Sequence, residues 1–270
     1  MTSACEEERL AAAATFGVNF ISFERLSAGN SSRNFRAVTQ NGKCYFVKFA
    51  PERDIERAIE KLSKIFSPLI PTLAFGGKSG KFASVGFFAT NWAAEGKSIP
   101  PDEFTEENIS SILEAYSSLS AALQAIDPDC LGAWDGLEEE ARKLSITPKT
   151  IHGDFHYKNF FFRNGKVSAV FDLECIRRGL ETDDLLRIFI HALERTPFSK
   201  TRKHQKIKEN FAKLVAKSPY PRESFLASLK LYERHKIARR KAKSRSRILF
   251  AIENYFRTKI YRSLERIIKS

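Results

Sequence analysis

Residues 18–92 carry the pattern of strands for most of their length, and at 45–49 the side chains alternate as they do in half-buried strands. Five stretches rich in β-branched and aromatic residues are separated by turn-forming residues, and each is predicted to be a strand: 18–26, 34–39, 43–49, 70–75 and 83–92. Residues 52–66 instead carry apolar side chains at helical spacing, which predicts one helix between the third and fourth strands. This part of the chain is therefore predicted to be a small unit with an antiparallel sheet and one helix.

After about residue 100 the hydrophobic pattern takes a helical period. Thr105, followed by two glutamates, is typical of a helix start, and a shorter helix is predicted for residues 134–144. Everything from Asp183 onward is predicted to be helical. The fold class is therefore α+β with two lobes, a β-rich lobe of residues 1–92 and a helical lobe of residues 93–270.

Two Asn-Gly dipeptides lie between β-rich stretches, Asn41-Gly42 in the first lobe and Asn164-Gly165 in the second. Asn-Gly is the strongest short hairpin signal because both central positions of the tight turn need a positive φ. We therefore predict a hairpin at each place. The second hairpin interrupts the helical lobe with a two-stranded ribbon.

Residues 150–174, TIHGDFHYKNFFFRNGKVSAVFDLE, place several polar groups among many phenylalanines. Asp154 and Asn159 precede the first strand of the ribbon, and Asp172 follows the second. Because the ribbon folds back on itself, we expect Asn159 and Asp172 to lie side by side, with Asp154 slightly removed. Two oxygen-bearing side chains held together suit Mg²⁺, which takes a carboxylate or two plus phosphate oxygens. Asp154 is then placed to orient a hydroxyl group and take its proton.

HGDFHYKN followed by VFDLE resembles the H-G-D-x-x-x-x-N and hydrophobic-Asp-x-Glu/Asp motifs of the aminoglycoside phosphotransferase and choline kinase family, relatives of the protein kinases. The segment GLETDDLL at 179–186 is similar to the family's Gly-Asp-Pro-x-x-Asp-Leu-Ala element. SAGNSSRNFRAV and YFVKF, within residues 27–49, are similar to its phosphate loop and third-strand lysine. The resemblance spans about residues 20–195 and implies a bilobal, protein-kinase-like fold.

By this resemblance the chain is an ATP-dependent, Mg²⁺-requiring kinase that transfers the γ-phosphate to a hydroxyl group of a small molecule. Asp154 is implied to be the catalytic residue, and Asn159 and Asp172 are implied to hold the metal. The nucleotide is implied to be held by residues of the first lobe: Lys48, Glu56, Gly29, Asn30, Ser31, Ser32, Asn91 and Trp92. Whether ATP or GTP is preferred stays open.

Lys48 is implied to contact the nucleotide phosphates, and a glutamate of the following helix is implied to orient it. Glu52, Glu56 and Glu60 share one helix face, and we favour Glu56 over Glu60. Backbone N–H groups at 29–32 are implied to cover the phosphates, and residues 88–92 to hold the adenine.

Other polar residues near the motif have two interpretations each. His156 either lines the substrate cleft or is a hydrogen-bonded loop residue, and Glu174 is either a metal-site group or part of a surface ion pair. His152 is expected to form structural hydrogen bonds within its loop. Asp184 is expected to stabilise the same loop rather than take part in chemistry.

The acceptor is open. Cationic acceptors, such as choline and aminoglycosides, need acidic or aromatic walls, for which the sequence offers Glu174, Glu181, Asp183, Trp92 and Trp134. An anionic or lipid-linked sugar would instead favour Arg177 and Arg178 with the basic tail. Residues 170–189 also have a weaker similarity to bacterial lipopolysaccharide core sugar kinases, so an envelope sugar kinase at the membrane surface is the alternative function.

Charge is distributed unevenly along the chain, which has a net charge of +13. Residues 200–270 hold 22 lysine and arginine residues against 5 aspartate and glutamate residues. Within it, KIARRKAKSRSR, residues 236–247, lacks the interleaved aromatic residues of a single-strand platform, which disfavours nucleic acid as a partner. A basic amphipathic helix either packs by its apolar stripe or rests on an anionic membrane surface, and both interpretations are kept.

Four scattered cysteines without CxxC spacing disfavour a zinc site and fit reduced thiols. The acidic N-terminal stretch lacks the positive charge of a signal peptide, so a cytoplasmic location is expected, with contact to the inner face of the membrane as an option. A non-catalytic pseudokinase or basic binding module is a second alternative. It is disfavoured because Lys48, Asp154, Asn159 and Asp172 are all present.

Overall fold

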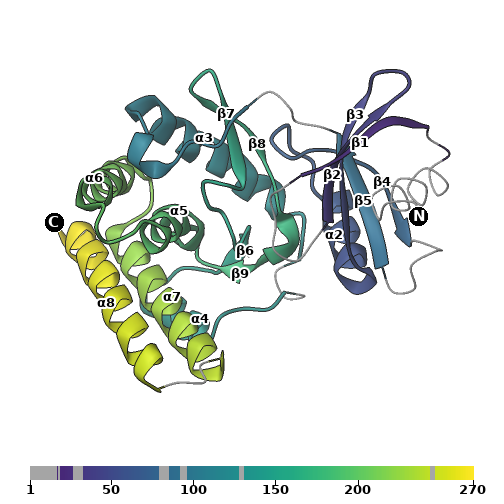
Figure 1. Ribbon diagram of the computed structural model, residues 1–270. Coiled ribbons are helices and arrows are strands. Elements are labelled where there is room, and N and C mark those ends of the chain that lie inside the picture. Colours follow the sequence, from purple (N-terminus) through teal and green to yellow (C-terminus); the bar gives the residue numbers. More distant parts are fainter. Residues whose placement is uncertain are drawn as a thin grey trace. The chain divides into compact units, whose positions relative to one another are not determined.

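A computed structural model describes residues 17, 19–26, 33–78, 85–91, 96–127, 131–243 and 247–270 (Figure 1). The chain divides into two compact units, Met1–Glu95 and Gly96–Ser270. The predicted boundary between the lobes, after residue 92, lies close to this division.

The N-terminal unit is built on a five-stranded antiparallel sheet in the order β1-β2-β3-β5-β4. Its elements are β1 (Phe20–Arg25), β2 (Arg33–Thr39), β3 (Cys44–Pro51), α2 (Glu52–Lys64), β4 (Leu73–Lys78) and β5 (Val85–Asn91). The five predicted strands and the predicted helix are therefore present. Strand β3 lies at the centre of the sheet, between β2 and β5.

Helix α2 packs against β3, β4 and β5. Its buried residues Ile55 and Ala58 form a cluster with Ala50 of β3. Successive side chains of a strand point to opposite faces of the sheet. Phe49 of β3 therefore lies on the other face, where its ring meets Phe35 edge to face at a centroid distance of 5.7 Å.

The Asn41-Gly42 hairpin forms, but its turn differs from the predicted one. Gly42 has a φ of 78°, whereas Asn41 does not have a positive φ. The N–H of Gly42 donates to the Thr39 carbonyl at 2.9 Å, and the N–H of Thr39 donates to the Lys43 carbonyl at 2.9 Å. This longer loop needs only one left-handed residue, and glycine supplies it. The expectation of two positive φ angles at this turn is wrong.

The C-terminal unit is mainly helical, with two small antiparallel strand pairs, β6–β9 and β7–β8 (Figure 1). Its elements are η1 (Pro101–Glu103), α3 (Glu106–Leu123), α4 (Leu137–Lys143), β6 (Lys149–Ile151), β7 (Phe160–Arg163), β8 (Lys166–Val170), η3 (Leu173–Cys175), β9 (Arg177–Gly179), α5 (Glu181–Arg195), α6 (Thr201–Lys217), α7 (Arg222–Lys243) and α8 (Arg247–Lys269). The predicted helical character from about Asp183 onward is confirmed, and α5 begins two residues earlier.

Helix α3 begins where the sequence predicts, and α4 begins later than predicted. The Thr105 hydroxyl accepts from the N–H of Asn108 at 3.2 Å, and the Asn108 side-chain oxygen accepts from the N–H of Thr105 at 3.0 Å, which closes a capping box. For α4, Trp134 lies in a turn and Gly136 has a φ of 84°, which a helix cannot contain. The helix therefore starts at Leu137.

The ribbon of β7 and β8 turns at Asn164 and Gly165, with φ angles of 48° and 78°. The predicted tight hairpin is therefore confirmed here. Helix α3 holds the ribbon, because Asn108 donates to the Gly165 carbonyl at 2.8 Å and the N–H of Val167 donates to the Ser111 hydroxyl at 2.8 Å. The ribbon phenylalanines Phe160 and Phe162 are buried, so the two ends of the ribbon are fixed in place.

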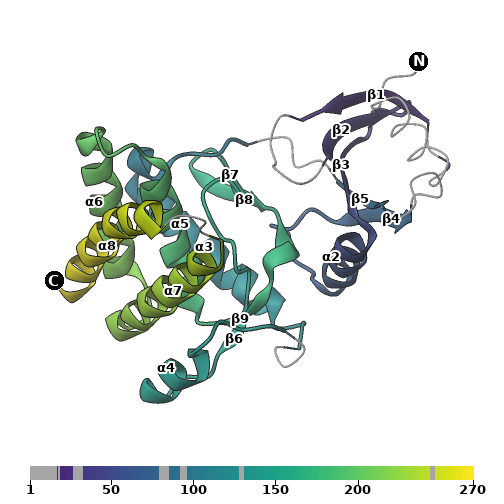
Figure 2. The same ribbon diagram turned by 60° about the horizontal axis from the view of Figure 1, so that its bottom comes forward.

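Helix α5 forms the centre of the C-terminal unit and contacts α6, α7 and α8. Helices α7 and α8 lie side by side in both views (Figures 1 and 2). Among the described residues, no helix combines the length and apolar character that crossing a membrane requires.

Candidate active site in the C-terminal unit

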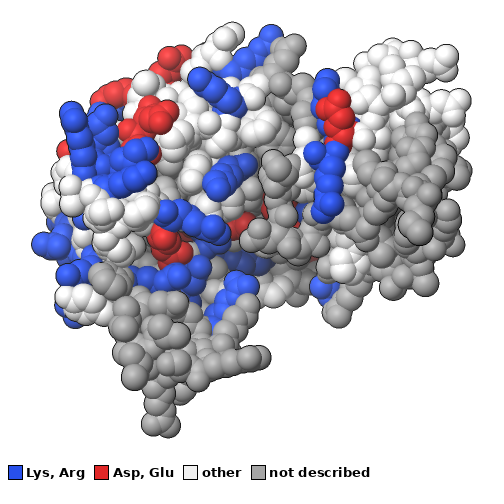
Figure 3. All heavy atoms as spheres, viewed as in Figure 1, with Lys and Arg blue, Asp and Glu red and all other residues white. Residues whose placement is uncertain are grey.

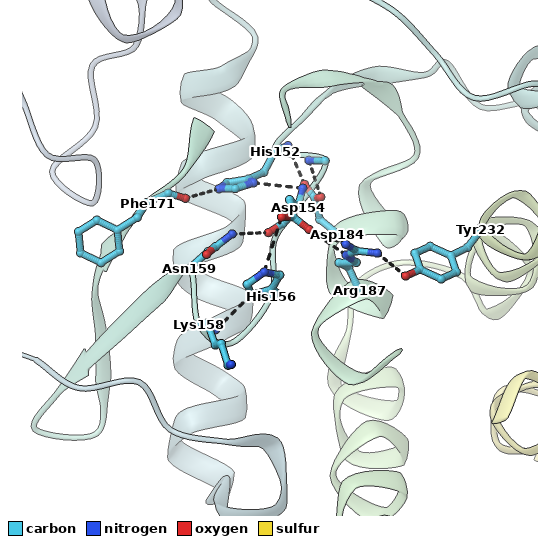
Figure 4. A network of polar contacts seen from close by, with 10 residues as sticks. His152, Asp154, His156, Lys158, Asn159, Phe171, Asp184, Arg187 and Tyr232 are labelled. Carbon is cyan, nitrogen blue, oxygen red and sulfur yellow. Dashed lines mark hydrogen bonds and ion pairs between the residues drawn. The ribbon is translucent and has the colours of Figure 1, made fainter. Parts of the chain in front are cut away.

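A loop of residues 152–159 joins β6 to β7, and the buried side chain of Asp184 holds its first turn (Figure 4). The Asp184 carboxylate accepts from the backbone N–H groups of His152 and Gly153, both at 2.8 Å. It also accepts from the Tyr116 hydroxyl at 3.1 Å. Burial raises the pKa of Asp184, while the charge of Arg177 and the hydrogen bonds from the two N–H groups oppose that rise. The expected loop-stabilising role of Asp184 is therefore confirmed.

Gly153 is required by the same turn. Its φ is 79°, and a Cβ atom at this position would lie 2.1 Å from the Cys175 carbonyl oxygen. No L side chain fits such a gap without movement of the backbone. The Gly of the His-Gly-Asp motif therefore permits a close approach between the 152–159 loop and the segment that follows β8.

His152 connects this loop to the end of the ribbon. Its Nδ1 accepts from the N–H of Asp154 at 3.3 Å, so the proton is on Nε2, which donates to the Phe171 carbonyl at 2.8 Å. His152 is fully buried. The predicted structural role of His152 is confirmed, and the histidine ties Asp154 to the residue that precedes Asp172.

Asn159 and Asp172 flank the open end of the ribbon, where Asn159 lies opposite Phe171, the residue before Asp172. The Asn159 carbonyl accepts from the N–H of Phe171 at 2.7 Å. The Asn159 side-chain nitrogen donates to the Asp154 carbonyl at 3.0 Å, which leaves Oδ1 as the atom able to coordinate a cation. Asn159 thus bridges the loop of Asp154 and the segment of Asp172.

Asp172 is one of three described non-glycine residues with a positive φ, at 63°. It precedes the short helix η3, and its side chain is exposed. A left-handed conformation costs a non-glycine residue about 1 kcal/mol, although aspartate tolerates it better than most. Such strain persists only where the surroundings impose it, and it is common at functional sites.

Arg187 of α5 holds the carboxylate of Asp154 (Figure 4). Its Nε and Nη2 donate to Oδ1 of Asp154 at 3.0 and 2.7 Å. Arg187 also donates to the Tyr232 hydroxyl. Partial burial would raise the pKa of Asp154, but the charge of Arg187 and its hydrogen bonds lower it overall. Asp154 is therefore ionised at neutral pH, with Oδ1 already engaged.

Two histidines are stacked beside Asp154. The rings of His156 and His191 lie 3.9 Å apart and 9° from parallel. Burial lowers the pKa of His156 to about 4, against the opposing charge of Asp154. Burial, His156 and Arg187 lower the pKa of His191 to about 3. Both rings are neutral at pH 7, so the 3.6 Å contact between His156 Nε2 and Asp154 Oδ2 is dipolar and not an ion pair.

The pKa of the Cys175 thiol is affected by the negative charges of this site. Desolvation, followed by the charges of Asp154, Asp172 and Glu174, raises the pKa of Cys175 to about 11. Both aspartates therefore lie within electrostatic reach of one thiol, and Asp172 also acts on His156. The structure brings Asp154, Asn159 and Asp172 together in one place.

Arg187, His191 and Tyr232 are site residues that the sequence analysis missed. Arg187 and His191 follow Asp184 by three and seven positions, so all three lie along one face of α5. Polar residues at that spacing within the apolar stretch 185–193 were a usable signal. Tyr232, from α7, gave none, because only the fold brings it to Arg187.

The predicted nucleotide-binding residues belong to the N-terminal unit. Lys48 is buried in the central strand β3 and faces the same side of the sheet as Ala50, which packs on α2. Glu56 of α2 is exposed, while Glu60 forms an ion pair with Lys64 at 2.8 Å. Asn91 ends β5 opposite Tyr45. Gly29, Asn30, Ser31, Ser32 and Trp92 lie outside the described residues, and the nucleotide roles remain predictions.

Most of the residues considered for the acceptor are used inside the C-terminal unit. Glu181 pairs with Lys149 at 2.9 Å, and Asp183 pairs with Arg177 at 3.0 Å. The Arg177 guanidinium also lies 3.5 Å above the Trp134 ring. Arg178 pairs with Glu138 at 2.9 Å. These side chains therefore support the fold beside the site. Such long-range pairing cannot be predicted from the residue types alone.

The donor set at the site fits a hard divalent cation. Asn159 offers an oriented amide oxygen and Asp172 an exposed carboxylate, and both are oxygen donors of the kind that Mg²⁺ takes. In the described part of the chain, no three His, Cys, Asp or Glu side chains form a cluster able to hold a metal. Two protein ligands alone fit an ion that keeps water or phosphate oxygens as its other ligands.

Comparison with known proteins agrees with this geometry. Residues 97–206, which contain the 152–159 loop, the ribbon and α5, match the model of the phosphotransferase enzyme family. Over these residues the chain is therefore similar to the phosphotransferase enzyme family. The prediction of a phosphotransferase that acts on a hydroxyl group is confirmed at this level. No curated protein sequence matches the chain.

Solved structures of phosphotransferases share the fold. A protein of Ralstonia eutropha JMP134 described as an aminoglycoside phosphotransferase has a TM-score of 0.57 at 13% identity, over 97% of this chain and 98% of that one. The amicoumacin kinase hAmiN has a TM-score of 0.59 at 12% identity, over 94% and 93%. The macrolide 2'-phosphotransferase MphH of Brachybacterium faecium has a TM-score of 0.55 at 11% identity, over 93% and 97%. The predicted kinase-like α+β fold is thereby confirmed.

Proposed function

We propose that this phosphotransferase transfers the γ-phosphate of ATP to a hydroxyl group of a small molecule, with Asp154 as the residue that orients the hydroxyl. The observation that carries the proposal is the contact between Arg187 and Oδ1 of Asp154. It fixes the carboxylate, keeps it ionised and leaves Oδ2 to accept the hydroxyl hydrogen.

The lowered pKa of Asp154 suits this role. A weakly basic carboxylate accepts a hydrogen bond from the hydroxyl group but does not remove its proton before transfer begins. Phosphoryl transfer proceeds through a loose transition state, so alignment of the attacking oxygen contributes more than early proton removal. Asp154 takes the proton as the new O–P bond forms.

Asn159, through Oδ1, and Asp172, through its carboxylate, are the residues proposed to hold Mg²⁺. The cation would supply charge neutralisation on the phosphate oxygens. The hAmiN structure contains AMP-PNP and Ca²⁺, which supports a nucleotide with a divalent cation in this fold. The protein itself holds these two ligands in place. The Asn159 side chain donates to the Asp154 carbonyl, and His152 donates to the carbonyl of Phe171, the residue before Asp172.

The N-terminal unit is proposed to bind the rest of the nucleotide. Lys48 would contact the phosphates, Glu56 would orient Lys48, and the backbone at 29–32 would cover the phosphates. Asn91 and Trp92 would hold the adenine. Burial of Lys48 on the α2 side of the sheet and the ion pair between Glu60 and Lys64 support Glu56 over Glu60 as its partner.

The acceptor is proposed to be a small compound with a hydroxyl group. Glu181, Asp183 and Trp134 are engaged within the fold and offer little to a cationic acceptor. Arg177 and Arg178, which favour an anionic sugar, are engaged as well. A transfer screen is therefore the decisive experiment.

The screen combines purified protein, ATP and Mg²⁺ with choline, ethanolamine, aminoglycosides, free sugars and lipid-linked sugars. Formation of ADP and of phosphorylated product is measured by mass spectrometry. One acceptor class is expected to accelerate ADP formation above a slow hydrolysis without acceptor. The same panel with GTP tests nucleotide preference.

A matched pair of variants controls the screen. Asp154→Asn is expected to remove transfer, whereas Asp135→Asn, an exposed aspartate outside the site, is expected to leave it unchanged. Absence of both transfer and slow hydrolysis from the folded wild-type protein, with either nucleotide and across the whole panel, would contradict the proposal.

A further inference from the structure

A groove of about 570 Å³ lies between α6 and α8 in the C-terminal unit. Four of its lining residues are cations, Lys208 from α6 and Lys259, Arg262 and Arg266 from α8, and none is acidic. Figure 3 shows lysine and arginine side chains gathered over α6 and the C-terminal end of α8. The groove shares none of its lining residues with the site around Asp154.

The groove cations differ from Lys203 and Lys217 of α6. Lys203 pairs with Asp102 at 2.9 Å, and Lys217 pairs with Glu106 at 2.7 Å. Within the described parts of the chain, no carboxylate forms an ion pair with Lys208, Lys259, Arg262 or Arg266. The fold therefore pairs these two α6 lysines with carboxylates of η1 and α3, and among the described residues it supplies no such partner to the groove cations.

The spacing of the groove cations keeps them together. Lys259, Arg262 and Arg266 lie at positions i, i+3 and i+7 of α8, which places them along one helix face. Burial and the nearby charge of Arg266 both lower the pKa of Lys208. Mutual repulsion without a compensating anion costs folding energy, so a ligand with negative charge would relieve it.

Exposed aromatic rings accompany these cations. Phe198, which lines the groove, is 46% exposed and stacks on His204. Tyr255, one turn before Lys259, is 58% exposed, and the Lys259 Nζ lies 4.6 Å from its ring centre. They are the two exposed large hydrophobic residues in the described part of the C-terminal unit.

We propose that the α6–α8 groove docks the protein on an anionic lipid bilayer, with Lys208, Lys259, Arg262 and Arg266 facing the lipid headgroups. Phe198 and Tyr255 enter the interface between headgroups and acyl chains. Aromatic rings favour that interface, and clustered lysines and arginines are attracted to anionic headgroups. The exposed rings favour this partner over a soluble anion, which would leave them in water.

The first test measures partition of the full chain to sedimented vesicles. Binding is expected on phosphatidylcholine vesicles with about one third phosphatidylglycerol and to be weak on phosphatidylcholine alone. Removing one cation is expected to weaken partition about fivefold, so Lys259→Gln/Arg262→Gln weakens it about 25-fold. Both residues are exposed on a helix, where glutamine is tolerated.

The matched control removes the same charges elsewhere in the unit. Arg142 of α4 and Lys166 of β8 are exposed and do not line the groove. Arg142→Gln/Lys166→Gln is expected to weaken partition by less than about threefold. An equal loss in both pairs would show attraction by net charge alone and would overturn the proposal.

The second test separates a bilayer from a soluble anion. Phe198→Ala is expected to weaken vesicle partition several-fold and to leave binding of inorganic polyphosphate unchanged. Strong polyphosphate binding in the groove, with vesicle partition indifferent to Phe198→Ala, would identify a soluble-anion site and overturn the proposal. Failure of the wild-type protein to bind anionic vesicles would overturn it as well. None of these outcomes depends on phosphoryl transfer.

Discussion

The 152–159 loop and the α6–α8 groove are both polar regions of the C-terminal unit, but they compensate charge in opposite ways. In the loop, the carboxylate of Asp184 has three hydrogen-bond donors and that of Asp154 has Arg187. In the groove, the four cations have no carboxylate partner among the described residues. In the loop, pairing within the fold fixes the positions of the carboxylates. In the groove, the cations remain able to attract an external partner with negative charge.

The largest expected effect comes from breaking the loop at its reactive carboxylate. Asp154→Asn is expected to lower turnover about 10³-fold, equivalent to about 4 kcal/mol, because the amide cannot accept the hydroxyl proton. The measurement is ADP formation with the acceptor found by the screen. Nucleotide affinity and thermal unfolding serve as controls and should change little.

Removing the Asp184 carboxylate, which holds the 152–159 loop, should reduce the stability of the folded protein. Asp184→Asn is expected to lower the free energy of unfolding by about 2–3 kcal/mol, because at least one buried N–H group loses its acceptor. Denaturant titration measures the change. Tyr116→Phe, which removes a single donor from the same carboxylate, is the matched control and should cost about 1 kcal/mol. Equal losses in both variants would mean that Asp184 does not hold the loop.

The next effect concerns the pH dependence of turnover. Arg187 lowers the pKa of Asp154, so the wild-type acidic limb should lie at low pH, and the neutral His156 and His191 should add none between about pH 5 and 8. In Arg187→Gln the positive charge that counters burial is gone, so the pKa of Asp154 rises. As the pH is lowered, activity is then lost at a higher pH than in the wild-type protein. Turnover at neutral pH should fall about tenfold.

Arg187→Lys sharpens this prediction, because it restores the charge without the two-nitrogen contact. It is expected to return the acidic limb toward the wild-type position. An unchanged pH profile in Arg187→Gln would show that Arg187 supports the fold alone and does not set the ionisation of Asp154.

The smallest effect belongs to the groove. Lys259→Gln/Arg262→Gln is expected to change the free energy of unfolding by less than about 0.5 kcal/mol, or to raise it, because no ion pair within the described chain is lost. Urea titration at low and moderate salt measures this. A loss of about 2 kcal/mol would mean that these cations are held by the fold, and the contrast with the loop would fail.

The sequence was sufficient where a local pattern specifies a local geometry. The β-rich stretches around the Asn164-Gly165 turn predicted the ribbon, and the ribbon brings Asn159 beside Phe171, the residue before Asp172. The capped start of α3 at Thr105 was readable for the same reason. Each of these features depends on residues that are close in sequence.

The sequence was insufficient where long-range contacts decide. Tyr232 reaches Arg187 from a different helix, and Glu181 and Asp183, considered for the acceptor, are instead paired inside the unit. The Asn41 backbone follows a longer loop than the dipeptide suggests, because Thr39 and Lys43 close it. Position in space, and not residue type, determines these roles.

The central claim is that the 152–159 loop and the end of the ribbon form one magnesium-dependent site for phosphoryl transfer. Calorimetric titration of a non-hydrolysable ATP analogue, with and without Mg²⁺, tests it in the wild-type protein, Asp172→Ala and Asp154→Ala. We predict that Mg²⁺ strengthens binding in the wild-type protein and in Asp154→Ala, and that this gain disappears in Asp172→Ala. A full magnesium-dependent gain in Asp172→Ala would contradict the account.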